Sequence, residues 1–309
     1  MIQGHSLSER RACPVCGSTI YMNFADEHID QEKINNFTYA SRKQPEFMCF
    51  HLVRCMRCNL VYAPKTPNRS FLSAAYADAA YDSGQEAQCA AKSYAHALVP
   101  YMAVLRNRTL AVDVGAGSGA LLPWLRDIGF QMVIGVEPSR AAINAAPASV
   151  KPLLREGMFG TELLNGVRPS LICSFMTLEH LDEPGQFVKT AYSLLEPRGM
   201  IALVVHNWCA LLNRLLGLRS PIIDVEHLQL FNPRSLRTLL TESGFVSIDL
   251  KSIRNVYPLQ YWLRLTPLPA GVKTRIAGAL HSLRLSDTQV SLPVGNILAV
   301  GRKLSDRKE

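Results

Sequence analysis

The sequence lacks any apolar stretch long enough to cross a membrane as a helix. Its longest uncharged runs, such as Gly199 to Asn213, fall short of the ~20 residues that a bilayer requires. The first residues, Met1 to Arg11, are polar and contain none of the apolar core that marks a secretory signal. We therefore expect a cytoplasmic protein whose thiols stay reduced.

Acidic residues are scarce, and one long segment near the C-terminus has none. The chain carries 33 lysines and arginines against 25 aspartates and glutamates, and the net charge of +8 favours anionic partners. An expected basic insert at 254–294 also contains Tyr257, Tyr261 and Trp262. Basic charge beside aromatic rings is typical of a surface that contacts a membrane or a lipid-linked anionic acceptor; a lid with a solvated basic face is the alternative. Between Asp249 and the next acidic residue, Asp287, the basic residues are Lys251, Arg254, Arg264, Lys273, Arg275 and Arg284.

Cysteine occurs in two Cys-x-x-Cys pairs, Cys13 with Cys16 and Cys55 with Cys58. Each pair can present two thiolates to one tetrahedral ion, so this spacing in a reducing compartment predicts zinc. A disulfide would require an oxidising compartment, and a redox pair would be expected in a βαβ context. Because four thiolates leave no position for water, the predicted zinc is structural rather than catalytic.

The segment from Thr109 to Gly119 predicts a buried strand that ends in a glycine-rich turn. Apolar residues around Asp113 form a run of strand length, and Gly115, Gly117 and Gly119 follow. A helical apolar pattern comes next. Strand, glycine turn and helix in this order are the layout of a nucleotide-binding crossover, in which glycine lets the backbone approach a ligand closely.

Further strands alternate with helical patterns along the chain. This alternation predicts an α/β fold with a parallel, doubly wound sheet, whose ligands bind beyond the carboxyl ends of the strands. Glu137 ends the second strand, where an acidic residue accepts hydrogen bonds from ribose hydroxyls. Glu179, His180 and His206 follow later strands. The later strands are expected at 131–136, 170–177, 200–205, 245–253 and 295–302.

The sequence Asp-Val-Gly-Ala-Gly-Ser-Gly at 113–119, together with Glu137, resembles motif I and its partner in class I S-adenosylmethionine-dependent methyltransferases. Segments 178–181, 194–199 and 227–231 also resemble later motifs of that family. The alternative, a nicotinamide-dependent oxidoreductase, would space its glycines as G-x-G-x-x-G. The resemblance implies a doubly wound, seven-stranded Rossmann-like methyltransferase sheet with a small zinc-ribbon-like N-terminal region.

The resemblance also implies S-adenosylmethionine as the cofactor and indicates the residues that bind it. Met158 and Phe159 follow the third strand, where they would flank the adenine. The expected cofactor-binding residues are Asp113, Gly115, Ala116, Gly117, Gly119, Glu137, Pro138, Met158, Phe159, Phe175 and Leu178.

The four-cysteine region, which continues into the segment 59–64, resembles a subgroup that includes the sugar C-methyltransferases of antibiotic biosynthesis. Those enzymes carry an additional C-terminal domain that this sequence does not contain, and they often have glycine in place of Asn59. In that subgroup a histidine after the fourth strand and a Glu-His pair before a late helix line the substrate pocket. The matching residues here are His180, Glu226 and His227.

Methyl transfer is an in-line displacement at a sulfonium methyl group, and an acceptor that must lose a proton needs a base. A histidine suits this task near neutral pH. We expect His227, held by Glu226, to be the base and His180 to be the second candidate; a hydrogen bond within a loop is the alternative role for either. A related ubiquinone-type O-methyltransferase subgroup uses a Glu-His pair, at the positions of Glu179 and His180, to hold a divalent cation.

The sequence predicts a zinc-binding region at 1–67, a helical linker or lid at 68–105 and a methyltransferase domain at 106–309. The expected function is methyl transfer to carbon or oxygen of a small-molecule, sugar or lipid-linked acceptor. A zinc-knuckle nucleic-acid-binding protein is a further alternative. Against it, Arg11 to Cys58 lacks a dense basic face interleaved with aromatic residues that would grip phosphates.

Overall fold

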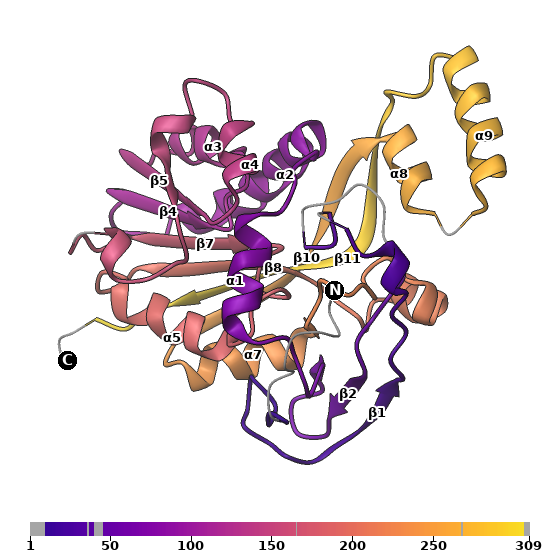
Figure 1. Ribbon diagram of the computed structural model, residues 1–309. Helices are drawn as coiled ribbons and strands as arrows, with labels where there is room; N and C mark the ends of the chain where they lie inside the picture. The colour runs from indigo at the N-terminus through magenta and orange to yellow at the C-terminus, as the bar shows by residue number, and fades with distance from the viewer. Residues whose placement is uncertain (1–9, 36, 40–45, 165, 267, 306–309) are drawn as a thin grey trace.

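Figure 1 shows the ribbon of the computed structural model. In the part of the chain that it describes, no helix is both long and apolar enough to span a membrane. Most of the polar stretch 1–11, on which the expected absence of a secretory signal rests, lies outside the described residues. The described residues are 10–35, 37–39, 46–164, 166–266 and 268–305.

The larger sheet has seven strands in the order β10-β11-β8-β7-β4-β5-β6. The predicted parallel sheet is mixed at one edge, because β11 runs antiparallel to both β8 and β10 while the other neighbouring pairs are parallel. The order of connection reverses between β4 and β7, which places a ligand site at the carboxyl ends of the central strands. The strands are β4 Leu110–Val114, β5 Met132–Glu137, β6 Leu154–Glu156, β7 Leu171–Phe175, β8 Met200–His206, β10 Val246–Pro258 and β11 Gln289–Arg302.

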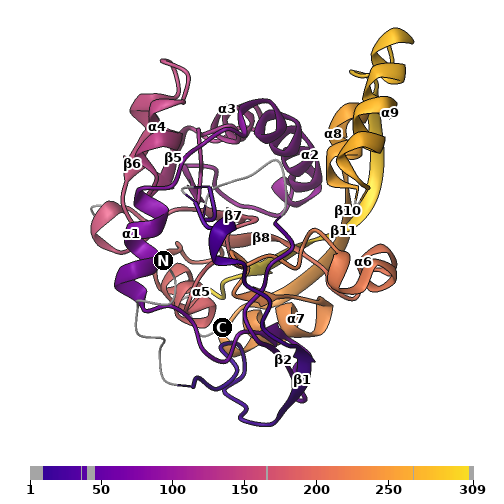
Figure 2. The same ribbon diagram turned by 45° about the vertical axis from the view of Figure 1, so that its right-hand side comes forward.

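Two helical layers cover the sheet, and Figures 1 and 2 show helices on both of its faces. Alternate residues of the central strands enter the two apolar layers. In β8, Ile201 and Leu203 pack in the layer that includes α5 and α7, while Ala202 and Val204 pack in the layer that includes α2 and α3. Burial on both faces explains why these strands are almost continuously apolar.

The starts of two helices follow from local hydrogen bonds. At the start of α7, the Asn232 side chain accepts hydrogen bonds from the backbone N–H groups of the first turn, and Pro233 is the first helical residue. Before α6, Asn207 Oδ1 accepts the backbone N–H of Cys209 in a turn, and the helix begins at Leu211. The helices are α1 Arg69–Ala77, α2 Gly84–Met102, α3 Leu122–Asp127, α4 Arg140–Asn144, α5 Pro184–Leu194, α6 Leu211–Leu216, α7 Pro233–Glu242, α8 Leu259–Leu265 and α9 Ala270–Ser282.

A second sheet joins distant parts of the chain in the order β1-β2-β3-β9. Its strands are antiparallel. Strand β9 comes from the segment that contains His227, and it pairs with β3 through Tyr62 opposite Gln229. The N-terminal region therefore shares a sheet with a loop of the larger unit. The strands are β1 Tyr21–Ala25, β2 Leu52–Cys55, β3 Val61–Tyr62 and β9 Gln229–Leu230.

The turn between β2 and β3 requires a left-handed backbone at Asn59, whose φ is +64°. Glycine adopts this conformation most readily, and asparagine tolerates it better than most other residues. The Asn59 N–H donates to the Cys55 carbonyl at 3.0 Å, which closes the second Cys-x-x-Cys turn. The conformation explains how asparagine can stand at a position that suits glycine.

The predicted basic insert is built on a long hairpin. Strands β10 and β11 stay paired as far as Pro258 and Gln289, and the chain between them forms α8 and α9. Both views place α9 outside the body of the protein, at the far end of the hairpin. No residue of α9 is buried.

Candidate functional site

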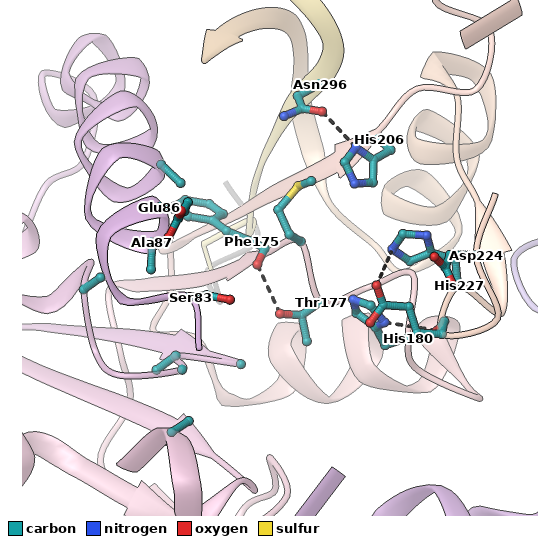
Figure 3. Close-up of a pocket in the computed structure, with 18 of the residues that line it drawn as sticks. Ser83, Glu86, Ala87, Phe175, Thr177, His180, His206, Asp224, His227 and Asn296 are labelled. Carbon is teal, nitrogen blue, oxygen red and sulfur yellow. Dashed lines mark hydrogen bonds and ion pairs between the residues drawn. The ribbon is translucent and has the colours of Figure 1, made fainter. Parts of the chain in front are cut away.

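A cavity of about 940 Å³ opens where the central strands end. Residues that follow β4, β5, β7 and β8 line it, together with residues of α2, α6 and the insert. Ligands of doubly wound sheets bind at this edge. Figure 3 gives a close-up of the cavity.

The glycine loop presents bare backbone to one end of the cavity. Gly115 and Gly117 have φ values of +76° and +55°, a region that glycine adopts without strain. A Cβ atom at Gly115 would lie 2.2 Å from Thr177 Oγ1, so no side chain fits there. A Cβ atom at Gly117 would meet only Tyr81 Cε2, at 3.7 Å. The loop at Gly117 therefore borders open space.

Two carboxyl groups accompany this loop. Glu137 accepts hydrogen bonds from the N–H groups of Gly117 and Ser139, each at 2.8 Å. Burial raises the pKa of Glu137, and the two hydrogen bonds oppose that shift. Burial also raises the pKa of Asp113 to about 7, and the nearby charge of Glu137 adds to the effect. A cationic ligand or a set of hydroxyl donors would favour the ionised form of both groups.

Three histidines line another part of the cavity. The ring centroids of His180 and His227 are 4.9 Å apart, and those of His206 and His227 are 5.5 Å apart. Figure 3 shows the three rings close together beside the ends of β7 and β8. Two of them come from loops and His206 ends a strand, so the cluster depends on the tertiary fold.

Each of the three rings has its Nδ1 atom beside an oxygen that can only accept a hydrogen bond. Nδ1–H is therefore the donor, and Nε2 keeps the basic lone pair in the neutral ring. The cavity thus contains three imidazoles of the same tautomer. The pairs are His180 with the Glu226 carbonyl at 3.1 Å, His227 with the Ile222 carbonyl at 2.9 Å and His206 with Asn296 Oδ1 at 3.0 Å.

His206 is held neutral by its surroundings. Burial lowers its pKa to about 4, and the hydrogen bond to Asn296 opposes that shift. Asn296 is itself oriented, because its Nδ2 donates to Asn255 Oδ1 at 3.0 Å. This network fixes the His206 ring without giving it a charge.

Glu179 does not face the cavity, although it precedes His180. Its side chain is fully buried. The carboxyl oxygen Oε1 accepts a hydrogen bond from the backbone N–H of His206 at 2.7 Å, and Oε2 has no hydrogen-bond partner. Burial raises the pKa of Glu179 to about 7. The alternative in which Glu179 and His180 hold a divalent cation therefore lacks its carboxylate ligand.

Glu226 lies beside His227, as the sequence predicts. Its Oε1 atom is 3.9 Å from His227 Nε2, which is within ion-pair range but too long for a hydrogen bond. His227 is 8% exposed, so a charge on its ring would be poorly solvated. The carboxylate can offset that cost when the ring takes up a proton.

Most predicted site residues line the cavity, but Gly119 and Leu178 do not. A Cβ atom at Gly119 would lie 2.5 Å from Val150 Cγ1, so this glycine allows the loop to pack against the next segment. Leu178 is fully buried in the apolar layer beneath α5. The predicted residues that do line the cavity are Asp113, Gly115, Ala116, Gly117, Glu137, Pro138, Met158, Phe159, Phe175, His180, Glu226 and His227.

The cavity also contains residues that the sequence did not identify as site residues. Tyr81, between α1 and α2, places its hydroxyl 2.8 Å from Ser118 Oγ. Met176 lines the cavity with φ +56°, an uncommon conformation for a long side chain. His206, which also lines the cavity, could be expected there because it ends a strand. Tyr81 belongs to a tyrosine-rich segment just before the glycine loop, and tyrosines in that position can line a substrate pocket. No sequence pattern marks Met176, because its place in the cavity depends on backbone conformation.

The four predicted zinc ligands come together in the N-terminal region. Cys13, Cys16, Cys55 and Cys58 are buried, and their sulfur atoms all lie within 4.8 Å of one another. The sulfur atoms of Cys13 and Cys58 are 3.5 Å apart, as are those of Cys16 and Cys55. Among the described residues, this is the one group of three or more ligating side chains close enough to share an ion.

The loop that carries His227 is tied to the loop that carries His180 by Gln229. The Gln229 side chain is fully buried, and its Nε2 atom lies within hydrogen-bond distance of three carbonyl oxygens of the second loop. These carbonyls belong to Leu178 at 2.7 Å, Glu179 at 3.0 Å and Leu181 at 2.7 Å. Gln229 thereby couples the positions of the two candidate bases.

The low pKa of His206 predicts a loss of stability in acid. A histidine of the unfolded chain titrates near pH 6.5, whereas His206 in the folded chain titrates at about 4. Between these values the unfolded chain binds the extra proton, so stability falls as the pH drops from about 6.5 to about 4. We expect His206 to account for about 3 kcal/mol of that fall.

The substitution His206→Asn isolates this effect, because its amide can still donate to Asn296. Urea unfolding across the same pH range should show a shallower acid loss in the variant than in the natural protein. Parallel curves for the two proteins would contradict the assignment.

Several solved structures resemble the chain at low identity. One is a SAM-dependent methyltransferase from Archaeoglobus fulgidus, with 16% identity over 76% of this chain and 100% of that one, at a TM-score of 0.46. Another is the plantazolicin methyltransferase BpumL in complex with SAH, with 16% identity, coverage of 77% and 91%, and a TM-score of 0.48. A third is a putative methyltransferase in complex with the Haloferax volcanii Trm112 activator, with 18% identity, coverage of 71% and 92%, and a TM-score of 0.47.

A family model described as a methyltransferase domain matches residues 85–250, which is more than half of the 309-residue chain. No curated protein matches the chain. The matched residues contain the glycine loop, Glu137 and the loops that carry His180 and His227. The chain therefore belongs to the methyltransferase-domain family, and the protein is a methyltransferase.

Proposed function

We propose that the protein transfers a methyl group to a carbon or oxygen atom of a small-molecule, sugar or lipid-linked acceptor. The supporting observation is the layout of one cavity, which a bare glycine loop and two carboxyl groups share with the imidazoles of His180 and His227. A donor site and a proton acceptor therefore open into the same space. Methyl transfer to a weakly acidic carbon or oxygen requires this combination, because the acceptor must lose a proton.

S-adenosylmethionine, when bound, supplies an electrophilic methyl group on a cationic sulfur. The residues present fit it: no Cβ atom obstructs Gly115 or Gly117, and Asp113 and Glu137 favour a cationic ligand. We assign the ribose hydroxyls to Glu137 and the adenine to the segment 157–159. Among the predicted contact residues, Gly119 and Leu178 would support the site from behind the cavity wall.

We assign the proton-accepting role to His227 and keep His180 as the second candidate. The Nδ1–H of His227 donates to the Ile222 carbonyl, so the basic lone pair of the neutral ring lies on Nε2, which can take the proton of the acceptor. Glu226 then stabilises the imidazolium that forms, since its Oε1 lies 3.9 Å from that nitrogen. His206 is the weaker base, because burial holds its pKa at about 4.

We propose structural zinc at the four cysteines. A tetrahedral site with zinc–sulfur bonds of about 2.3 Å has sulfur atoms about 3.8 Å apart. The two 3.5 Å pairs and the 4.8 Å limit on the whole set support this geometry. The ion would link the start of the chain to the turn between β2 and β3.

The remaining predictions extend this proposal. The four-cysteine region supports a place in the subgroup that resembles sugar C-methyltransferases. We propose a zinc-binding region at 1–67, a helical linker or lid at 68–105 and a methyltransferase domain at 106–309. We place the protein in the cytoplasm. We also propose peripheral contact of the basic insert with an anionic membrane surface, because α9 is exposed and the segment around it carries no acidic residue before Asp287.

The substitution Gly117→Arg tests the donor site. A long side chain at this open, left-handed position would occupy the space in front of the loop, so binding of S-adenosylhomocysteine should weaken by about 100-fold or more. Isothermal titration calorimetry would measure the affinity. Gly278→Arg, on the exposed helix α9 with no neighbouring atom within 4 Å of its Cβ position, is the matched control. Unchanged affinity in Gly117→Arg would remove the loop from the cofactor site.

The substitution His227→Ala tests the base. Turnover should fall by about 10²-fold to 10⁴-fold while the affinity for S-adenosylhomocysteine stays within about twofold, because the ring acts on the acceptor. Turnover would be followed as label transferred from S-adenosylmethionine to metabolites of a host-cell extract. His281→Ala, on the exposed helix α9, is the control. An undiminished rate in His227→Ala would transfer the role to His180.

Metal analysis tests the zinc site. We expect about one zinc per chain in the natural protein and a clear loss of zinc in Cys13→Ser and Cys58→Ser. These variants should also unfold at a temperature lower by about 10 °C or more, because metal binding contributes folding energy. Cys89→Ser, outside the cluster, should keep both properties. Full zinc content in the cluster variants would contradict the site.

A further inference from the structure

Part of the cavity is lined by residues of α6 and of the insert. We call this part the outer compartment. Its lining is apolar, in contrast to the carboxyl groups and imidazoles of the inner part. Principal lining residues are Leu212, Leu216, Leu263, Ile276, Leu280 and Leu292.

Three of these side chains stay in contact with solvent although they face a cavity. The exposed fractions are 45% for Leu212, 37% for Ile276 and 37% for Leu292. They come from α6, α9 and β11, which are distant in the sequence but converge on the same space. An apolar ligand between them would remove all three surfaces from water at once, which is favourable.

Helix α9 gives a second reason to expect a ligand here. It has 13 residues, none of them buried, and an isolated helix of that length is only marginally stable in water. Its contacts with the rest of the protein run mainly through α8. A ligand packed against Ile276 and Leu280 would supply the apolar contact that the helix lacks.

The charges around the outer compartment indicate the kind of ligand. On the insert side, Lys273, Arg275 and Arg284 occur with no acidic residue before Asp287. On the α6 side, Arg214 and Arg219 are exposed in another segment without acidic residues. None of these five residues lines the cavity, so an anionic group of the ligand would meet them outside it, and only the apolar chain would lie within the compartment.

We propose that the outer compartment binds the long apolar chain of an amphiphilic acceptor that also carries an anionic group. The inference rests on the proposed function, because it places the reacting end of that acceptor at the histidines and its chain between α6 and α9. A sugar or another fully polar acceptor would leave the apolar walls of the compartment in water.

Fluorescence titration of the full-length protein with 11-(dansylamino)undecanoic acid tests the proposal, since this probe combines an apolar chain with a carboxylate. The double variant Leu212→Asn/Ile276→Asn makes the walls polar, and its dissociation constant should rise by about tenfold or more. The matched control is Leu211→Asn/Leu283→Asn, which changes two leucines that are 73% and 66% exposed and do not line the cavity. The control should bind within about twofold of the natural protein.

Dansylglycine, which has the same fluorophore and carboxylate but no long chain, should bind at least about tenfold more weakly than the undecanoic acid. Equal affinity for both probes, or an equal loss in the two double variants, would overturn the proposal. Titration of every variant with S-adenosylhomocysteine separates the two proposals. Normal cofactor binding with no chain selectivity would reject the outer compartment alone, whereas absent cofactor binding in the natural protein would reject the donor site.

Discussion

The pairing of β3 with β9 is the constraint on which the arrangement of the site depends. It joins Tyr62 of the N-terminal region to Gln229 of the loop that carries His227. The Gln229 side chain contacts three carbonyls of the loop that carries His180. Arg11 strengthens the junction, because its Nε donates to the Ala63 carbonyl at 2.9 Å and its Nη2 to Gln229 Oε1 at 3.2 Å. The loops that carry His180 and His227 are far apart in the sequence, and these contacts hold them in a fixed position relative to each other.

Through this junction the cysteine cluster affects the position of the histidines, although the cluster lies outside the histidine site. The cluster closes the turn between β2 and β3, and β3 carries one side of the pairing with β9. Arg11 lies two residues before Cys13, and burial lowers its pKa to about 10, still well above neutral pH. A buried charge of this kind is tolerated because carbonyl oxygens surround it. The four-cysteine region is therefore part of the support for the histidines.

The geometry around the glycine loop could be predicted from sequence because it is local. The loop, the acidic residue before it and Glu137 are set by a single crossover, and the grouping of the four cysteines is set by their own spacing. The arrangement around the histidines could not be predicted in the same way. The link between Tyr81 and Ser118, the role of Gln229 and the burial of Glu179 all require the tertiary fold. The sequence predicted the last two strands, β10 and β11, but not their lengths, because a hairpin can extend beyond a sheet without any change in the local sequence pattern.

The hairpin of β10 and β11 separates the helices α8 and α9 from the seven-stranded sheet. The residues of α8 and α9 enter and leave the fold through one pair of strands, whose outermost partners are Pro258 and Gln289. A segment of different length or polarity at this end would leave the register of the seven strands unchanged. A change in α8 and α9 would therefore alter the part of the cavity that the insert lines without altering the glycine loop or its two carboxyl groups.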